Sequence, residues 1–137
     1  MGDDVEEPAV VPEELRYTSQ HEWVLAGAQG TVRIGITDYA QRQLGDVVYV
    51  ELPPVGDSVA PGEPVGEVES TKSVSEIFAP VAGEVIACNE ALQDSPELVN
   101  SDPYGVGWMI EVKLADRSAT DSLMDADDYR ILIEEDG

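Results

Sequence analysis

Turn-forming residues recur at short intervals through the middle of this chain, and this punctuation limits most strongly what it can fold into. From Val55 to Ala87 the segments between Gly, Pro and Asp are short and rich in Val and Ile. β-branched residues favour the pleated, half-buried surface of a strand, whereas Gly and Pro favour turns. The pattern therefore predicts a small barrel or sandwich built from short strands.

The segments on either side extend this β pattern. "EWVLAGAQGTVRIGI" (residues 22–36) contains two strand-like runs joined by a turn at 27–30, which predicts a hairpin. "DVVYVEL" (residues 46–52) is typical of a strand that Pro53 and Pro54 stop. "WMIEVKL" (residues 108–114) predicts a further strand near the end of the chain.

Short helices are expected at the periphery of this β structure. Thr37 can cap a helix over residues 38–44, and Gly45 can end it. "SPELVN" predicts one helical turn, with Ser95 as its cap and Pro96 at its first position.

A last helix is expected over "ADDYRILI" (residues 126–133), with Asp125 as its cap. It is amphipathic, and its apolar side chains could cover one end of the barrel: Tyr129, Leu132 and Ile133. The predicted fold class is therefore mostly β with short peripheral helices.

The length of 137 residues predicts one domain with a modest core. We expect residues 1–14 to form a flexible acidic tail and residues 15–137 to form the domain. The single cysteine, Cys88, cannot form an intrachain disulfide, and no apolar run is as long as a membrane span. The N-terminus has neither the arginines of a transit peptide nor a signal-peptide core. These features predict a soluble, cytoplasmic protein.

The formal net charge of −22, from 29 acids and 7 bases, argues against nucleic acid and anionic membranes as partners. The acids are spread along the whole chain. Such a surface is expected of a protein adapted to high salt, where self-repulsion is screened, and equally of an acidic protein kept soluble by its charge.

One of only two lysines, Lys72, lies at the centre of a weak two-fold pattern. Pro61-Gly62 precedes it and Gly83 follows it at similar spacings, and each half contains a short apolar run. Two such halves meeting at a turn would place Lys72 at a hairpin tip, between the small residues Thr71 and Ser73. An exposed amine there could be acylated by another enzyme. The alternative is an ordinary exposed lysine in a turn.

Catalytic interpretations have little support in this sequence. His21, the single histidine, has no second triad residue nearby and is expected to be packed or on the surface. Cys88 follows an apolar run, as a buried small hydrophobe would. No metal-ligating, CxxC or phosphate-binding motif occurs. Acids near Lys72 favour its protonated form, which disfavours a Schiff-base role: Glu67, Glu69, Glu76 and Glu84.

"ESTKSVSEIFAPVAGEV" resembles the lipoyl-attachment motif, and in particular that of the glycine cleavage system H-protein family. "HEWV", "GITDYAQRQLGDVVYVELPPVG" and "SPELVNSDPYGVGW" extend the resemblance over about residues 15–133, in the family's order. The attachment motif is shared by all lipoyl domains, whereas the N-terminal stretches and the last one are specific to H proteins.

The resemblance implies a hybrid barrel-sandwich fold and lipoate in amide linkage to Lys72. It implies a prokaryotic, monomeric carrier without catalytic activity, which takes an aminomethyl group from glycine decarboxylase to an aminomethyltransferase and is reoxidised by dihydrolipoyl dehydrogenase. The resemblance marks Glu69 as part of recognition by a lipoyl-attaching enzyme. Ser101, Asp102 and Tyr104 are in a Gly-rich loop that could pack against the barrel or edge a groove for the loaded arm, where a carboxylate could hold an amine.

Other functions stay open at this point. A lipoyl domain of a 2-oxoacid dehydrogenase complex would usually be part of a longer chain. A biotin carrier usually has methionines beside its lysine, where this chain has Thr71 and Ser73. A protein that relays lipoyl groups would also keep Lys72 acylated, and an unmodified structural adaptor is the alternative from a different class.

Overall fold

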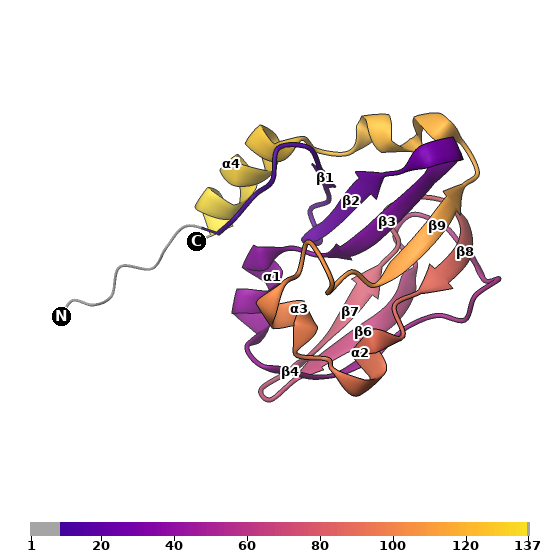
Figure 1. Ribbon diagram of the computed structural model, residues 1–137. Coiled ribbons are helices and arrows are strands. Elements are labelled where there is room, and N and C mark those ends of the chain that lie inside the picture. Colours follow the sequence, from indigo (N-terminus) through magenta and orange to yellow (C-terminus); the bar gives the residue numbers. More distant parts are fainter. Residues whose placement is uncertain (1–8, 137) are drawn as a thin grey trace.

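Two antiparallel β-sheets enclose one apolar core in the computed structural model, which describes residues 9–136 (Figure 1). The larger sheet has the strand order β1-β2-β3-β9-β8-β5. Its strands are β1 (Arg16–Tyr17), β2 (Glu22–Ala26), β3 (Thr31–Ile36), β5 (Ser58–Val59), β8 (Gly83–Cys88) and β9 (Ile110–Leu114). This mostly β architecture was predicted.

The smaller sheet has the order β4-β6-β7. It consists of β4 (Val47–Glu51), β6 (Pro64–Ser70) and β7 (Val74–Phe78). Side chains alternate along a strand, so one face of this sheet supplies Val50, Val68 and Ile77 to the core, while the other faces solvent. Its central hairpin, β6–β7, ends at the turn that carries Lys72.

The predicted hairpin over residues 22–36 is confirmed: β2 and β3 pair, and the connection contains a short 3-10 helix, η1 (Ala28–Gly30). The expected helix α1 (Asp38–Leu44) also forms. Thr37 Oγ1 accepts from the Ala40 N–H at 3.2 Å, and Gly45 ends the helix with a φ of 83°, a conformation that favours glycine.

The helical turn expected from Ser95 differs from the observed structure. Ser95 follows α2 (Ala91–Asp94), and its N–H donates to Ala91 O, so it closes one helix instead of capping the next. The next helix, α3 (Leu98–Ser101), begins later, with Glu97 as its N-cap. The Ser95 N–H satisfies one of the carbonyls at the end of α2, and the Leu98 N–H donates to Ser95 O at 3.1 Å, so residues 95–98 form a turn between the two short helices.

At the C-terminus, η2 (Arg117–Ser122) leads to α4 (Ala126–Asp136), which Asp125 caps as predicted by accepting from the Asp128 N–H at 2.9 Å. Tyr129 of α4 stacks on Tyr17 with ring centres 4.6 Å apart. Leu132 and Ile133 pack against the same cluster, so α4 covers one end of the molecule as expected (Figure 1).

The predicted acidic tail is described only from residue 9 onward. Within that part, Val11 is buried in the cluster beneath α4, and Tyr17 Oη donates to Pro12 O at 2.5 Å. Residues 10–12 therefore lie along the domain. Across residues 9–136, no helix is both long enough and apolar enough to cross a membrane.

Candidate functional site

Lys72 occupies the turn between β6 and β7, as its spacing predicted, and its side chain is exposed. The Ser70 N–H donates to Ser73 O at 2.8 Å, which closes the turn. The Ser70 hydroxyl is buried and accepts from the N–H groups of Lys72 at 3.2 Å and Ser73 at 3.1 Å. One small polar side chain therefore holds the backbone on both sides of the lysine.

The turn also rests on the connection between α1 and β4. The Thr71 N–H donates to Asp46 O at 3.0 Å. A methyl group placed on Gly45 would lie 3.2 Å from Lys72 Cε, so the lysine chain passes directly over this glycine. Gly45 leaves room for the lysine here as well as ending α1.

Glu69 is exposed on the smaller sheet and directly precedes Ser70, whose N–H closes the turn. Its cross-strand neighbours are Tyr49 on β4 and Val74 on β7, and all three are exposed. An acid and two large side chains therefore form one row beside Lys72. Glu69 is open to contact by another protein, and its role in recognition stays a prediction.

A cleft of about 420 Å³ opens beside the turn. Residues 20–22, α1 and the start of β7 form its walls, and the apolar side chains of Ile36, Leu44 and Ile77 line its floor. Polar groups at its rim include Glu76 and Ser73. The cleft thus begins at the residue that follows Lys72.

Glu22 is a buried acid in the wall of this cleft, with 2% of its surface exposed. Thr18 Oγ1 donates to Glu22 Oε1 at 2.8 Å, and the Phe78 N–H donates to Oε2 at 2.9 Å. Burial outweighs these two hydrogen bonds and raises the pKa of Glu22 to about 7. Its carboxyl group also joins the first residue of β2 to the last residue of β7.

His21 is packed, as expected, and it lies in the wall of the cleft. Its Nδ1 is 2.9 Å from Tyr129 Oη, and its ring lies 4.9 Å from that of Tyr39. Its φ of 69° is in the left-handed region, which is uncommon for a residue other than glycine. Sequence reasoning assigned His21 no catalytic role and did not single out Glu22, because their neighbours in the cleft, α1 and β7, are distant along the chain.

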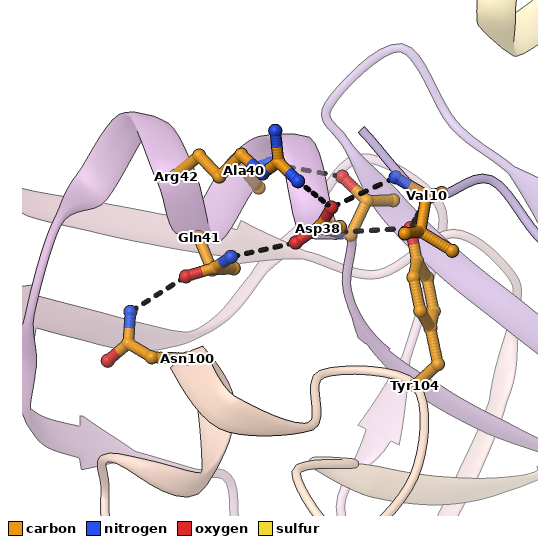
Figure 2. Close-up of polar contacts among 8 residues, drawn as sticks. Val10, Asp38, Ala40, Gln41, Arg42, Asn100 and Tyr104 are labelled. Carbon is orange, nitrogen blue, oxygen red and sulfur yellow. Dashed lines mark hydrogen bonds and ion pairs between the residues drawn. The ribbon is translucent and has the colours of Figure 1, made fainter. Parts of the chain in front are cut away.

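The three loop residues predicted to edge a groove do not line this cleft. Ser101 ends α3, and Asp102 Oδ2 accepts from the Val106 N–H at 3.1 Å within the loop. Tyr104 Oη donates to Val10 O at 2.6 Å and accepts from the Asp38 N–H at 3.0 Å (Figure 2). Burial raises the pKa of Tyr104 to about 12. Contact of these residues with a loaded arm stays a prediction.

Two other side chains that could react, Cys88 and Lys113, are held within the fold. Cys88 is half-buried, its Sγ lies 2.9 Å from Pro53 O, and burial raises the pKa of its thiol. A raised pKa keeps a thiol protonated and unreactive. Lys113 lies within β9, paired on both sides with Thr31 and Glu84, so it is in a strand interior, as expected.

The family model described as "Glycine cleavage H-protein" matches residues 15–136 of this chain. The chain belongs to this family. A glycine cleavage system H protein of Burkholderia ambifaria is 56% identical over 124 residues, covering 90% of this chain and 98% of the relative. One of Micrococcus luteus is 59% identical over 120 residues, covering 87% and 94%.

The fold comparison agrees with the family. A crystal structure of a glycine cleavage system H protein from Mycobacterium marinum superposes with a TM-score of 0.82 at 41% sequence identity, covering 90% of this chain and 99% of that one. The resemblance stated from the sequence and the predicted barrel-sandwich class are both confirmed.

Proposed function

We propose that this H-protein family member is a lipoyl carrier of glycine cleavage and that Lys72 is its attachment point. The observation that supports this most directly is an exposed amine on a turn braced by a buried hydroxyl, in a chain that has little other lysine. A rigid tip lowers the ordering that a modifying enzyme must impose when it binds.

The residues around Lys72 fit a lipoyl group. The cleft begins beside the lysine and combines an apolar floor of Ile36, Leu44 and Ile77 with acids at its wall and rim. The floor would hold the hydrocarbon part of the group, and Glu22 or Glu76 would hold a positively charged amine on it. When attached, a lipoyl group supplies a cyclic disulfide that accepts an aminomethyl group and is reduced in the process.

The partners follow from this role. We infer that glycine decarboxylase loads the carrier, that an aminomethyltransferase unloads it and that dihydrolipoyl dehydrogenase reoxidises it. The protein itself would catalyse none of these steps. Its contribution would be to keep the carried group at high local concentration near each active site and out of bulk water. Relay of lipoyl groups to other proteins is a second role that the same turn would support.

We also infer that the protein acts as a monomer in the cytoplasm of a prokaryote. The bacterial sources of the relatives support this location. Nucleic acids and anionic membranes are disfavoured as partners by the net charge of −22.

Replacement of Lys72 tests the attachment site. Lys72→Arg keeps the positive charge but removes the primary amine, so we expect an unchanged fold and complete loss of lipoylation by a purified lipoate–protein ligase. Lys113→Arg is the matched control and should be modified at the normal rate. Intact mass and peptide mapping give the result. A lipoyl increment on Lys113, or carrier activity in the Lys72→Arg protein, would refute the assignment.

A further inference from the structure

One side chain amide on α3, that of Asn100, holds the connection on which the Lys72 turn rests. Asn100 Nδ2 donates to Gly45 O and to Gln41 Oε1, both at 2.9 Å, and Asn100 Oδ1 accepts from the Val47 N–H at 2.8 Å. The amide thus contacts the end of α1, the glycine after it and the first residue of β4. Both of its N–H groups and its oxygen are engaged.

This connection in turn holds the Lys72 turn at three points. Asp46 O accepts from the Thr71 N–H, Val47 pairs with Ser70 across β4 and β6, and Gly45 lies directly beneath the Lys72 side chain. Asn100 contacts Gly45 and Val47 directly, and Asp46 lies between them. The path from Asn100 to the lysine therefore needs only one intermediate residue.

The same network continues away from the lysine and keeps Asn100 in place. Gln41 Nε2 donates to Asp38 Oδ1 at 2.8 Å, which orients the Gln41 oxygen toward Asn100 (Figure 2). Asp38 Oδ2 in turn accepts from the Val10 N–H at 2.9 Å and pairs with Arg42 at 3.2 Å. The amide of Asn100 consequently has one favoured orientation, set by Gln41 on α1 and by the backbone groups of Gly45 and Val47.

We infer that Asn100 is a positioning residue for acylation of Lys72. Its amide fixes the α1–β4 connection, and that connection fixes the position of the Lys72 turn at the end of the β6–β7 hairpin. Acylation is faster when the protein already holds the reacting amine in one position. It is slower when the modifying enzyme must order the amine each time it binds. The inference deepens the proposed function and rests on it for the acylation step alone.

Asn89 provides a matched control for a purely structural role. Its side chain amide likewise joins separate segments, in a buried position: its Nδ2 donates to Val106 O and Trp108 O, both at 2.7 Å, and its Oδ1 accepts from the Ala91 N–H at 3.2 Å. None of these three hydrogen bonds involves the α1–β4 connection or the Lys72 turn. Asn89→Ala should therefore destabilise the fold without loosening the lysine.

The first measurement uses the unmodified protein. Amide hydrogen exchange is followed at Thr71, whose N–H is bonded to Asp46 O, and at Gly62, whose N–H is bonded to Ala79 O away from the turn. Loss of about one net hydrogen bond of support corresponds to exchange about tenfold faster. We expect that increase at Thr71 in Asn100→Ala, with little change at Gly62 and no such difference in Asn89→Ala.

The second measurement is lipoylation by a purified lipoate–protein ligase with lipoate and ATP, at a temperature where all variants are folded. We expect kcat/KM to fall about tenfold for Asn100→Ala, mainly through KM for the protein substrate, and to stay normal for Asn89→Ala. Asn100→Asp keeps the acceptor for Val47 but turns a carboxylate oxygen toward Gly45 O. It should resemble Asn100→Ala.

Equal Thr71 exchange and equal kcat/KM in the Asn100 and Asn89 variants would overturn the inference. If neither Asn100 variant folds, Gln41→Ala removes one of the three contacts from a half-buried surface position, and about threefold faster exchange at Thr71 is then expected. Absence of lipoylation in the unaltered protein would refute the proposed function, while the exchange result would still decide whether Asn100 holds the turn.

Discussion

Glu22 shows how one buried side chain can link the two sheets and titrate near neutral pH. Its oxygens accept from the Thr18 hydroxyl and from the Phe78 N–H, so it joins β2 of the larger sheet to the end of β7 in the smaller one. Desolvation raises its pKa to about 7 from a reference value of 4.5. The carboxyl group is therefore protonated in the folded protein at pH values where it is ionised in the unfolded chain.

This difference predicts a pH dependence of stability. Between pH 4.5 and 7 the folded state binds more protons at Glu22 than the unfolded state, so the free energy of unfolding falls as pH rises through this window. The loss at Glu22 amounts to at most about 3 kcal/mol and is complete by about pH 8, one unit above the folded pKa. Denaturant titrations at pH 4.5, 6 and 8 would measure it.

Glu22→Gln is the control for this prediction, because many other acids titrate over the same range. The amide does not ionise, so the variant should lose about 3 kcal/mol less than the unaltered protein between pH 4.5 and 7. It should be destabilised by a constant amount at low pH, since a single amide oxygen replaces two carboxyl acceptors. Identical pH profiles would show that Glu22 has an ordinary pKa in the fold.

Glu69, in contrast to the buried Glu22, is an acid on the surface of the protein. It is exposed beside the Lys72 turn, so removal of its charge should leave stability within about 0.5 kcal/mol of normal. We expect Glu69→Gln to slow lipoylation by a lipoate–protein ligase about fivefold, the effect of one interface contact of about 1 kcal/mol. Glu84→Gln, which removes a charge from the larger sheet, should be modified at the normal rate.

At the scale of single elements, local chemistry predicted most of what formed. Thr37 and Asp125 cap helices because their side chain oxygens reach N–H groups three residues ahead, a contact that needs no distant partner. The position of Lys72 at a hairpin tip was likewise predicted from the spacing of turn residues in the sequence. The predicted Ser95 cap was wrong because Ser-Pro fits a turn after one helix as well as the start of the next, and here residues 95–98 form such a turn, so α3 begins only at Leu98.

The cleft and the Asn100 contacts could not be predicted from short stretches of the sequence. The cleft joins residues 20–22 to α1 and β7, and Asn100 contacts positions more than 50 residues earlier in the chain. Contacts of that range depend on how two sheets pack, which no short motif encodes. "LVN" in the sequence identifies an asparagine at the end of a helical turn but not the backbone groups that it meets.

The segment around Val10 is an element whose attachment can be tested. Tyr104 Oη donates to Val10 O and accepts from the Asp38 N–H, so Tyr104→Phe leaves both backbone groups without this partner. We expect a loss of about 1–2 kcal/mol in the free energy of unfolding and faster proteolysis within residues 9–14. Tyr49→Phe removes an exposed hydroxyl and should change neither. Equal behaviour of the two variants would show that Tyr104 does not hold the segment.

The whole molecule has a compact apolar core beneath a strongly acidic surface. On the solvent face of the smaller sheet, Glu51, Glu67 and Glu76 are directly opposed across three strands. No ion pair to these three acids is found among residues 9–136. Like charges directly opposite each other destabilise a sheet. The fold therefore tolerates repulsion that dissolved salt would screen.

Thermal stability is accordingly expected to rise with ionic strength. Screening of about 2 kcal/mol of repulsion would raise the melting temperature by roughly 5–10 °C for a domain of this size, between 10 mM and 1 M sodium chloride. The double variant Glu51→Gln/Glu67→Gln separates charge screening from general effects of salt, because it removes opposed charges and leaves the core unchanged. It should melt higher than the unaltered protein at 10 mM salt and gain less on addition of salt. A melting temperature that does not respond to salt in either protein would mean that repulsion among the acids does not lower stability. The acids would then have a role in solubility alone.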